Sequence, residues 1–287
     1  MDQKYIDLFD GYTHGLMKRR EFLERLTLLA GSTAAASALL PTLENNYAYA
    51  EMVAESDERI SAETITYDSK LGKVSGYLAK PKTPPKTPGV IVISENRGLN
   101  PHIKDMARRL ATEGFLALAP DYLSLKGGTP SDEDKARDLI GTLTQDETTA
   151  ISEASLAALA TRPDCTGKVA AVGFCWGGGK VNELAVNEPS LAAGVAYYGA
   201  QPKADQVPAI KAPLLLHYAG LDDRINAGIP AFEKALKDNG KQYEIHIYEG
   251  VNHAFNNDTN AARYNKAAAD LAWNRTLHFL RKNLFTA

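Results

Sequence analysis

The chain has 287 residues, of which 44% are hydrophobic and 23% charged, and its formal net charge at pH 7 is −3. This length can bury a sizeable core and lies within the range of α/β folds. The slightly acidic balance argues against a nucleic-acid-binding protein, because phosphates call for a basic face. The two cysteines, Cys165 and Cys175, are too few for a disulfide framework, so a free thiol is expected.

Residues 1–50 form an N-terminal extension that resembles an export signal. Arg19 and Arg20 precede a weakly hydrophobic stretch of small residues, and the sequence AYA at 48–50 fits a cleavage site. The arginine pair resembles the Tat signal, which passes already folded proteins, and it predicts a periplasmic protein. The alternative is a cytoplasmic protein that keeps this segment as a helix packed on the body. The apolar run is too polar and too interrupted to predict a stable membrane span.

Residues 51–287 form a predicted α/β domain in which strands and helices alternate. A β-hairpin is expected over 62–82, and the apolar run at 89–95 is typical of a parallel strand buried on both faces. Further strands are expected at 116–122, 168–174, 191–199, 212–220 and 243–250, and helices at 102–115, 132–143, 149–162, 176–188, 229–240 and 267–284. This alternation predicts a mostly parallel, doubly wound sheet with helices on both faces.

The stretch GFCWG at 173–177 joins an expected strand to an expected helix. It has the pattern of the nucleophile elbow of the α/β-hydrolase fold, with Cys175 where serine is usual. Gly173 and Gly177 remove side chains that would collide with neighbouring elements at so sharp a turn. The following helix N-terminus would favour a thiolate and a developing oxyanion. A buried structural cysteine and a glycine-rich phosphate cradle are the alternatives.

In this fold the catalytic acid and histidine follow the nucleophile along the chain. Asp222 comes directly after one expected strand, and His253 lies in the loop after the next. We therefore expect Cys175 as nucleophile, Asp222 as orienting acid and His253 as base. The remaining histidines of the body are expected to be structural or exposed: His102, His217, His246 and His278.

Five segments of the body together resemble the dienelactone hydrolases (carboxymethylenebutenolidases): VIVISENRGLN, LALAPDY, GKVAAVGFCWGGG, HYAGLDD and YEGVNHAF. The resemblance implies hydrolysis of a small ester or lactone at Cys175. It also implies a fourth functional residue, Glu95, which contacts the cysteine and helps to form the thiolate. By the same likeness, the backbone N–H groups of Asn96 and Trp176 would form the oxyanion hole.

The chain departs from that family at its substrate-binding arginines. Asn257 stands four residues after His253, where the family has one arginine. The second arginine has no clear counterpart, and Lys135 and Arg137 are the two candidates for its place. The hydrolysis itself is therefore expected, whereas the arginine with which the family holds a carboxylate-bearing lactone is replaced here by Asn257.

Two further residues are candidates for substrate binding. Arg97 could offer a cation at the mouth of the site, and Tyr122 could line an apolar pocket together with Trp176. No metal or cofactor is expected, since no His/Cys ligand spacing supports one. A hydrolase fold retained as a non-catalytic binding protein is the alternative function, and a thiol redox protein is disfavoured because no C-x-x-C motif is present.

Overall fold

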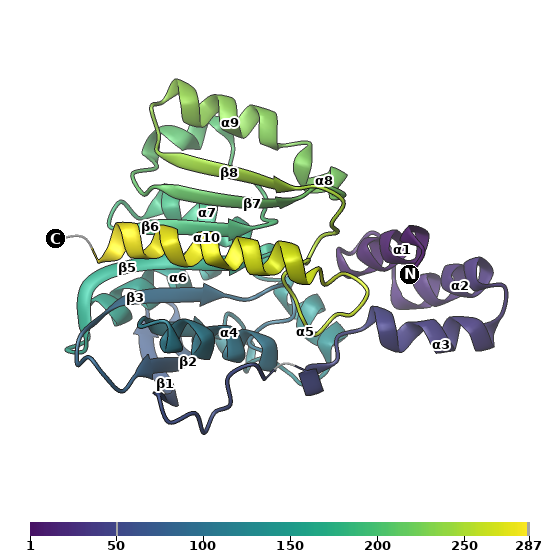
Figure 1. Cartoon of the computed structure of the whole chain (residues 1–287), viewed down its shortest axis with the longest axis horizontal. Coiled ribbons are helices and arrows are strands. Elements are labelled where there is room, and N and C mark those ends of the chain that lie inside the picture. Colours follow the sequence, from purple (N-terminus) through teal and green to yellow (C-terminus); the bar gives the residue numbers. More distant parts are fainter. Residues whose placement is uncertain (50, 286–287) are drawn as a thin grey trace.

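The computed structural model describes residues 1–49 and 51–285. At its centre lies an eight-stranded sheet in the order β1-β2-β4-β3-β5-β6-β7-β8 (Figure 1). The strands are β1 (Ile60–Ser69), β2 (Gly72–Pro81), β3 (Thr87–Ile93), β4 (Leu116–Pro120), β5 (Cys165–Phe174), β6 (Ala193–Tyr197), β7 (Leu214–Ala219) and β8 (Tyr243–Tyr248). The β1–β2 and β2–β4 pairs are antiparallel and the other neighbours are parallel, which confirms the mostly parallel sheet expected from the sequence.

Helices cover both faces of this sheet (Figure 1). On one face, α4 (Pro101–Thr112) and α10 (Lys266–Leu284) contribute to one hydrophobic cluster. On the other, α6 (Gln145–Ala160), α7 (Trp176–Asn187) and α9 (Ile229–Asp238) contribute to a second. The short helices α5 (Glu133–Ile140) and α8 (Asp223–Asn226), and the 3₁₀ turns Tyr47–Tyr49, Ser124–Lys126 and Ala204–Ala209, complete the elements.

The expected helix at 149–162 begins four residues earlier than its apolar pattern suggests. Thr144 accepts a hydrogen bond from the backbone N–H of Glu147, and the Glu147 carboxylate accepts one from the backbone N–H of Thr144. This capping box satisfies two backbone donors at the helix start and fixes it there. The polar first turn therefore belongs to α6, although hydrophobic periodicity alone does not reveal it.

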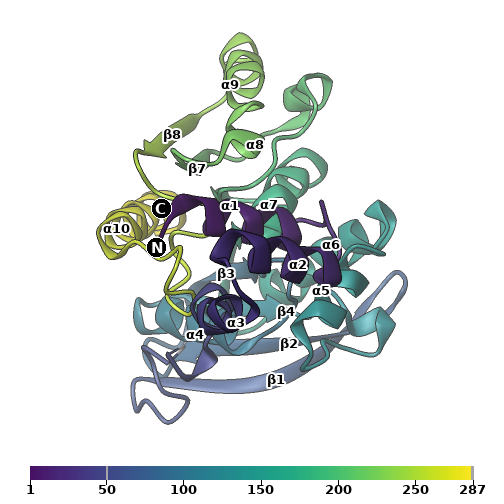
Figure 2. The same cartoon turned by 90° about the vertical axis from the view of Figure 1, so that its right-hand side faces the viewer.

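The N-terminal extension folds into three helices, α1 (Gln3–Thr13), α2 (Arg19–Ala30) and α3 (Thr33–Leu43). They lie at the end of the sheet toward which the parallel strands point, and Figure 2 looks onto them. Their shared core contains Phe9, Tyr12, Phe22, Leu26, Ala36 and Leu43. The segment thus packs on the body, and its role as an export signal stays a prediction. The expected cleavage sequence ends at residue 50, which lies outside the described residues.

The α2–α3 junction is a sharp corner. Gly31 ends α2 in the left-handed region with φ 82°, and Ser32 begins α3 by accepting a hydrogen bond from the backbone N–H of Ala35. Within residues 1–49 and 51–285, no single helix combines the length and apolar character needed to cross a membrane. The α2–α3 pair meets those criteria only when counted together, and its two halves are bent by 115°.

Candidate active site

Cys175 sits on a strained turn between β5 and α7. Its backbone has φ 55° and ψ −117°, a region that residues with side chains rarely adopt. A Cβ on Gly173 would lie 2.2 Å from the carbonyl oxygen of Gly177, and a Cβ on Gly177 would lie 2.4 Å from that of Ile93. Both distances are far too short for carbon and oxygen, so the predicted steric need for glycine at 173 and 177 is confirmed. Trp176 is the first residue of α7, so its backbone N–H has no carbonyl partner within the helix.

Asp222 and His253 meet as expected from their order in the chain. The Nδ1 atom of His253 lies 2.5 Å from Oδ2 of Asp222, and both side chains are buried. Asp222 also begins α8, where its carboxylate accepts a hydrogen bond from the backbone N–H of Ile225. The Nε2 atom of His253 has no hydrogen-bond partner in the described part of the chain, and one nitrogen of this ring lies within 4.8 Å of Sγ of Cys175. The structure therefore brings all three residues of the expected triad together.

A second histidine, His14, lies at Cys175 as well. Its Nε2 atom is 3.6 Å from Sγ of Cys175, and its ring meets that of His253 edge-on with centroids 4.6 Å apart. His14 immediately follows α1, and α1 is the helix of the N-terminal extension that leads to the site. Sequence reasoning missed His14 because the segment around it was interpreted as an export signal, and no spacing to a known motif marks it.

The charges around the thiol favour its ionised form. Burial by itself would raise the pKa of the Cys175 thiol, but the positive charge of His253 and a hydrogen bond from His14 outweigh burial and lower this pKa to about 6. Burial acts to lower the pKa of His253, yet the Cys175 thiolate and the hydrogen bond to Asp222 raise it. At neutral pH the pair therefore favours a thiolate beside an imidazolium.

Glu95 follows β3 by two residues and lies in a small hollow that Cys175 and His253 also line. It is 5% exposed, and its Oε2 atom accepts a hydrogen bond of 2.9 Å from Nδ2 of Asn257. Its other oxygen has no partner among the described residues. Asn257, where the resembled family has an arginine, is thus fully buried and holds the glutamate instead of facing a substrate.

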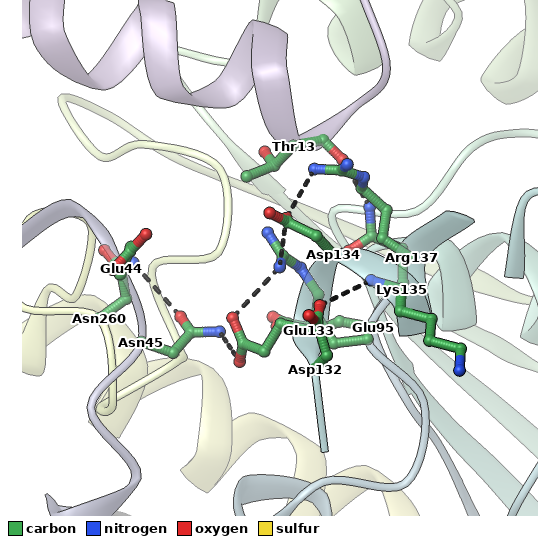
Figure 3. A network of polar contacts seen from close by, with 12 residues as sticks. Thr13, Glu44, Asn45, Glu95, Asp132, Glu133, Asp134, Lys135, Arg137 and Asn260 are labelled. Carbon is green, nitrogen blue, oxygen red and sulfur yellow. Dashed lines mark hydrogen bonds and ion pairs between the residues drawn. The ribbon is translucent and has the colours of Figure 1, made fainter. Parts of the chain in front are cut away.

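Arg97 does not stand at the mouth of the site. It is 7% exposed, and its Nη1 atom lies 3.1 Å from Oε2 of Glu133 and 3.6 Å from Oδ1 of Asp134. Figure 3 shows these two acids of α5, with Asn45 of the N-terminal segment donating a hydrogen bond of 3.1 Å to Glu133. Arg97 lines the small hollow that also contains Glu95 and Cys175, and not the large cavity, so the expected place at the mouth of the site is corrected to a buried one with its charge paired to α5.

Tyr122 is not a wall of the substrate cavity either. It is fully buried, its hydroxyl lies 2.6 Å from Oγ of Ser152, and its ring meets that of Trp176 edge-on at 5.1 Å. Tyr122 packs against the ring of Trp176, and of these two residues only Trp176 lines the cavity. The sequence shows that both residues are aromatic, but it does not show which of them faces the cavity.

A cavity of about 630 Å³ opens above the thiol. Its lining includes Cys175, His253, Asn96 and Trp176 from the body, and Thr13, His14 and Gly15 from the N-terminal segment. Arg137, Lys180 and Arg224 add cationic groups to its walls. The exposed Lys135 is absent from this lining, so Arg137 is the better placed of the two sequence candidates.

The sequence predicted no metal site, yet one set of ligating atoms comes together at the thiol. Among the described residues, His14, Cys175 and His253 each place one such atom within 4.8 Å of the others. Two imidazoles and a thiolate are ligands that suit Zn²⁺. No sequence spacing could reveal this set, since its three members come from distant parts of the chain.

The fold and this constellation define an α/β-hydrolase with a cysteine at the nucleophile position. The model of the dienelactone hydrolase family matches residues 74–284, and a separate YqhI-like model matches residues 1–31. The chain belongs to the dienelactone hydrolase family.

Its relatives agree with this placement. A Saccharolobus solfataricus protein named "Putative carboxymethylenebutenolidase" is 34% identical over 254 residues, which cover 76% of this chain and 97% of that protein. The crystal structure of a "Putative Dienelactone Hydrolase" from Klebsiella pneumoniae is 30% identical, covers 76% of this chain and 97% of its own, and has a TM-score of 0.70. A dienelactone hydrolase-like promiscuous phosphotriesterase from metagenomic libraries, at 24% identity, shares the fold with a TM-score of 0.69 over 79% of this chain and 99% of its own.

Proposed function

We propose that the protein hydrolyses small esters or lactones through a cysteine nucleophile and an acyl-thioester intermediate. The observation that carries the proposal is the thiol of Cys175, raised on a strained turn into a cavity beside the Asp222–His253 pair. Family membership supports hydrolysis in general. The position of Asp222 and His253 beside Cys175 supports the acyl-thioester route in particular.

In the first half of the reaction, the thiolate attacks the substrate carbonyl and forms a C–S bond. The backbone N–H groups of Asn96 and Trp176 stabilise the negative charge that develops on the carbonyl oxygen. The C–O bond to the leaving group then breaks, and protonated His253 gives its proton to the departing oxygen. In a lactone, that oxygen remains attached to the acyl group.

In the second half, neutral His253 takes a proton from water as the water oxygen attacks the thioester carbonyl. The C–S bond breaks, the acid is released, and the thiolate–imidazolium pair is restored. Asp222 keeps the Nδ1 proton of His253 in place throughout, so that Nε2 exchanges protons with the substrate and water. No step needs a metal or cofactor.

The direct test compares Cys175→Ala with Cys165→Ala. Cys165 is also buried, but it lies at the start of β5, at the other end of the strand that leads to Cys175. We expect Cys175→Ala to lose hydrolysis of short p-nitrophenyl esters and of lactones by about 1000-fold or more, and Cys165→Ala to retain it. Full activity of Cys175→Ala would refute the cysteine route. Binding of the same ligands by wild-type protein without turnover would support the alternative, a non-catalytic binding protein.

The cellular compartment in which the protein acts is a separate proposal. We keep periplasmic export through the Tat-like arginine pair as a prediction, with a cytoplasmic protein as the alternative. The low exposure of Cys175 would protect a reactive thiol in an oxidising compartment. Fractionation of the native host, with the mass of the mature protein, tests the location and whether residues 1–50 are retained.

A further inference from the structure

The sulfur of Cys175 and two imidazole rings place metal-binding atoms close together beside the cavity. Nε2 of His14 lies 3.6 Å from Sγ of Cys175, and one nitrogen of His253 lies within 4.8 Å of both. A tetrahedral zinc ion, with a Zn–N bond of about 2.0 Å and a Zn–S bond of about 2.3 Å, holds the nitrogen and the sulfur about 3.5 Å apart. His14 and Cys175 are therefore already spaced as two ligands of one ion.

The hydrogen bonds of each ring leave one nitrogen available for a metal. Nδ1 of His253 lies 2.5 Å from Oδ2 of Asp222, which leaves Nε2 as the available atom. Nδ1 of His14 lies 2.8 Å from the backbone carbonyl oxygen of Asp10. A carbonyl oxygen only accepts hydrogen bonds, so the neutral His14 ring has its proton on Nδ1 and its lone pair on Nε2. A carboxylate or carbonyl oxygen behind the ring is the usual support of a histidine that binds a metal.

Two buried polar atoms at the thiol lack a partner among the described residues. They are Nε2 of His253, a residue that is 2% exposed, and Oε1 of Glu95, a residue that is 5% exposed. Both residues line the small hollow at Cys175. A buried polar atom without a partner costs free energy. A cation at the thiol would bind the first atom directly and would interact favourably with the carboxyl group that contains the second.

The two guanidinium groups that line this hollow are paired with acids. Nη1 of Arg263 lies 2.8 Å from Oδ1 of Asp10, and Nη1 of Arg97 lies 3.1 Å from Oε2 of Glu133. Their charges are therefore largely balanced and oppose a bound cation only weakly. The Asp10 pair also holds α1 against the body, so the helix that leads to His14 is fixed beside the thiol.

We propose that His14, Cys175 and His253 bind one Zn²⁺ ion, and that this ion reversibly switches the hydrolase off. The inference rests on the cysteine hydrolysis proposed above. Two imidazoles and a thiolate favour zinc over Mg²⁺ and Ca²⁺, which prefer oxygen ligands. All three residues line the cavity, so the fourth tetrahedral position is open to a water molecule.

Zinc binding and catalysis exclude each other because they use the same atoms. The metal needs a thiolate and neutral imidazoles, so the one proton that Sγ of Cys175 and Nε2 of His253 hold between them is released to water. A lone pair of each atom then binds the ion. The sulfur can no longer attack a carbonyl, and His253 can no longer give a proton to the leaving oxygen. A chelator that removes the ion restores both groups.

The site depends on the N-terminal segment, which supplies one of its three ligands. His14 directly follows α1 and has no counterpart within the body. A chain cleaved after residue 50 would retain only Cys175 and His253, and two protein ligands hold zinc far less firmly than three. Sensitivity to zinc is thus a property of the chain that keeps its extension.

The first test is equilibrium dialysis of the full-length protein against Zn²⁺, followed by measurement of the bound metal. We expect one ion per chain in the wild type and at least about 100-fold weaker binding in His14→Gln, because loss of a supporting partner alone already costs about 10- to 100-fold. His278→Gln is the matched control, since His278 is an exposed histidine on α10, and it should bind zinc as the wild type does. Co²⁺ bound to the wild type should show a thiolate-to-metal charge-transfer band, which Cys175→Ala should lack.

The second test measures hydrolysis of a short p-nitrophenyl ester with and without zinc. Zinc at about ten times its dissociation constant should lower the rate of the wild type and of His278→Gln about tenfold, and EDTA should restore it. Each variant is compared with its own zinc-free rate. At the same concentration, zinc should leave the rate of His14→Gln close to its zinc-free value.

The outcomes separate the site, the switch and the proposed function. The site is refuted if the wild type binds no zinc, if Co²⁺ gives no charge-transfer band, or if His14→Gln and His278→Gln bind zinc equally. The switch is refuted if the zinc-loaded protein hydrolyses the ester as fast as the zinc-free protein or faster. Failure of the cysteine mechanism is seen without any metal, because Cys175→Ala would then remain active in EDTA.

Discussion

The two imidazoles at Cys175 come from opposite ends of the chain and are held by different acceptors. His253 belongs to the loop after β8 and lies 2.5 Å from a carboxylate oxygen, whereas His14 directly follows α1 and lies 2.8 Å from a backbone carbonyl oxygen. A carboxylate stabilises a positively charged ring more strongly than a neutral carbonyl does. The imidazole from the body, His253, is therefore held by the charged carboxylate of Asp222. The imidazole from the N-terminal segment, His14, is held by the neutral backbone carbonyl of Asp10.

This difference predicts unequal effects of removing the two acidic side chains. Asp222→Asn replaces the carboxylate that holds His253, and we expect kcat/KM to fall about 1000-fold or more. Asp10→Asn leaves the backbone carbonyl in place and removes only the ion pair with Arg263, so the loss should stay below about tenfold. Steady-state kinetics on one ester measures both. Similar losses of kcat/KM in the two variants would show that His253 and His14 do not differ in how their acceptors hold them.

We expect a smaller effect on the reactivity of Cys175 when the pH is lowered. Because the pKa of Cys175 is lowered to about 6, the thiolate is the main form at pH 7 and is lost as the pH falls below 6. Alkylation of wild-type protein by iodoacetamide should therefore be fast at pH 7 and slow about tenfold for each further unit below 6. Mass spectrometry should place the label on Cys175 and leave the buried Cys165 unmodified. A half-point near the ordinary thiol value of about 8.5 would contradict the ion pair.

The smallest effect concerns how the two regions hold together. Arg19 pairs with Asp134 at 2.7 Å and with Glu44 at 3.3 Å, and its side chain is 47% exposed. Arg19→Ala should lower the free energy of unfolding by less than about 1 kcal/mol, as is usual for exposed ion pairs. Urea unfolding measures the change. A loss several times larger would mean that this ion pair is a main anchor of the segment.

Most of the body could be predicted from the sequence because its signals are local. The glycines around Cys175, the apolar run of β3 and the positions of Asp222 and His253 after successive strands each follow from steric or topological rules. Those rules apply within one strand–turn–helix unit or from one strand to the next. The order of elements then places the strand ends at one edge of the sheet, which is why the triad comes together.

The remaining site residues depend on contacts between distant segments, which the sequence does not display. His14 reaches the thiol only because α1 docks on Arg263 and Asn96. Arg97 is neutralised by Glu133 of α5, and Tyr122 lies behind Trp176. From residue type alone, the sequence predicts that Arg97 offers a cation to the substrate and that Tyr122 lines the cavity. Burial and partners, which determine their roles, come from packing.

The cavity is walled by residues from both ends of the polypeptide, and this affects its synthesis. The ribosome releases Thr13 and His14 first, but the loop that carries His253 emerges only when the chain is nearly finished. Until then Cys175 lies against an incomplete wall, open to water and oxidants. Rapid seating of α1 on the completed sheet would shorten the period in which a newly made molecule carries an unprotected sulfur.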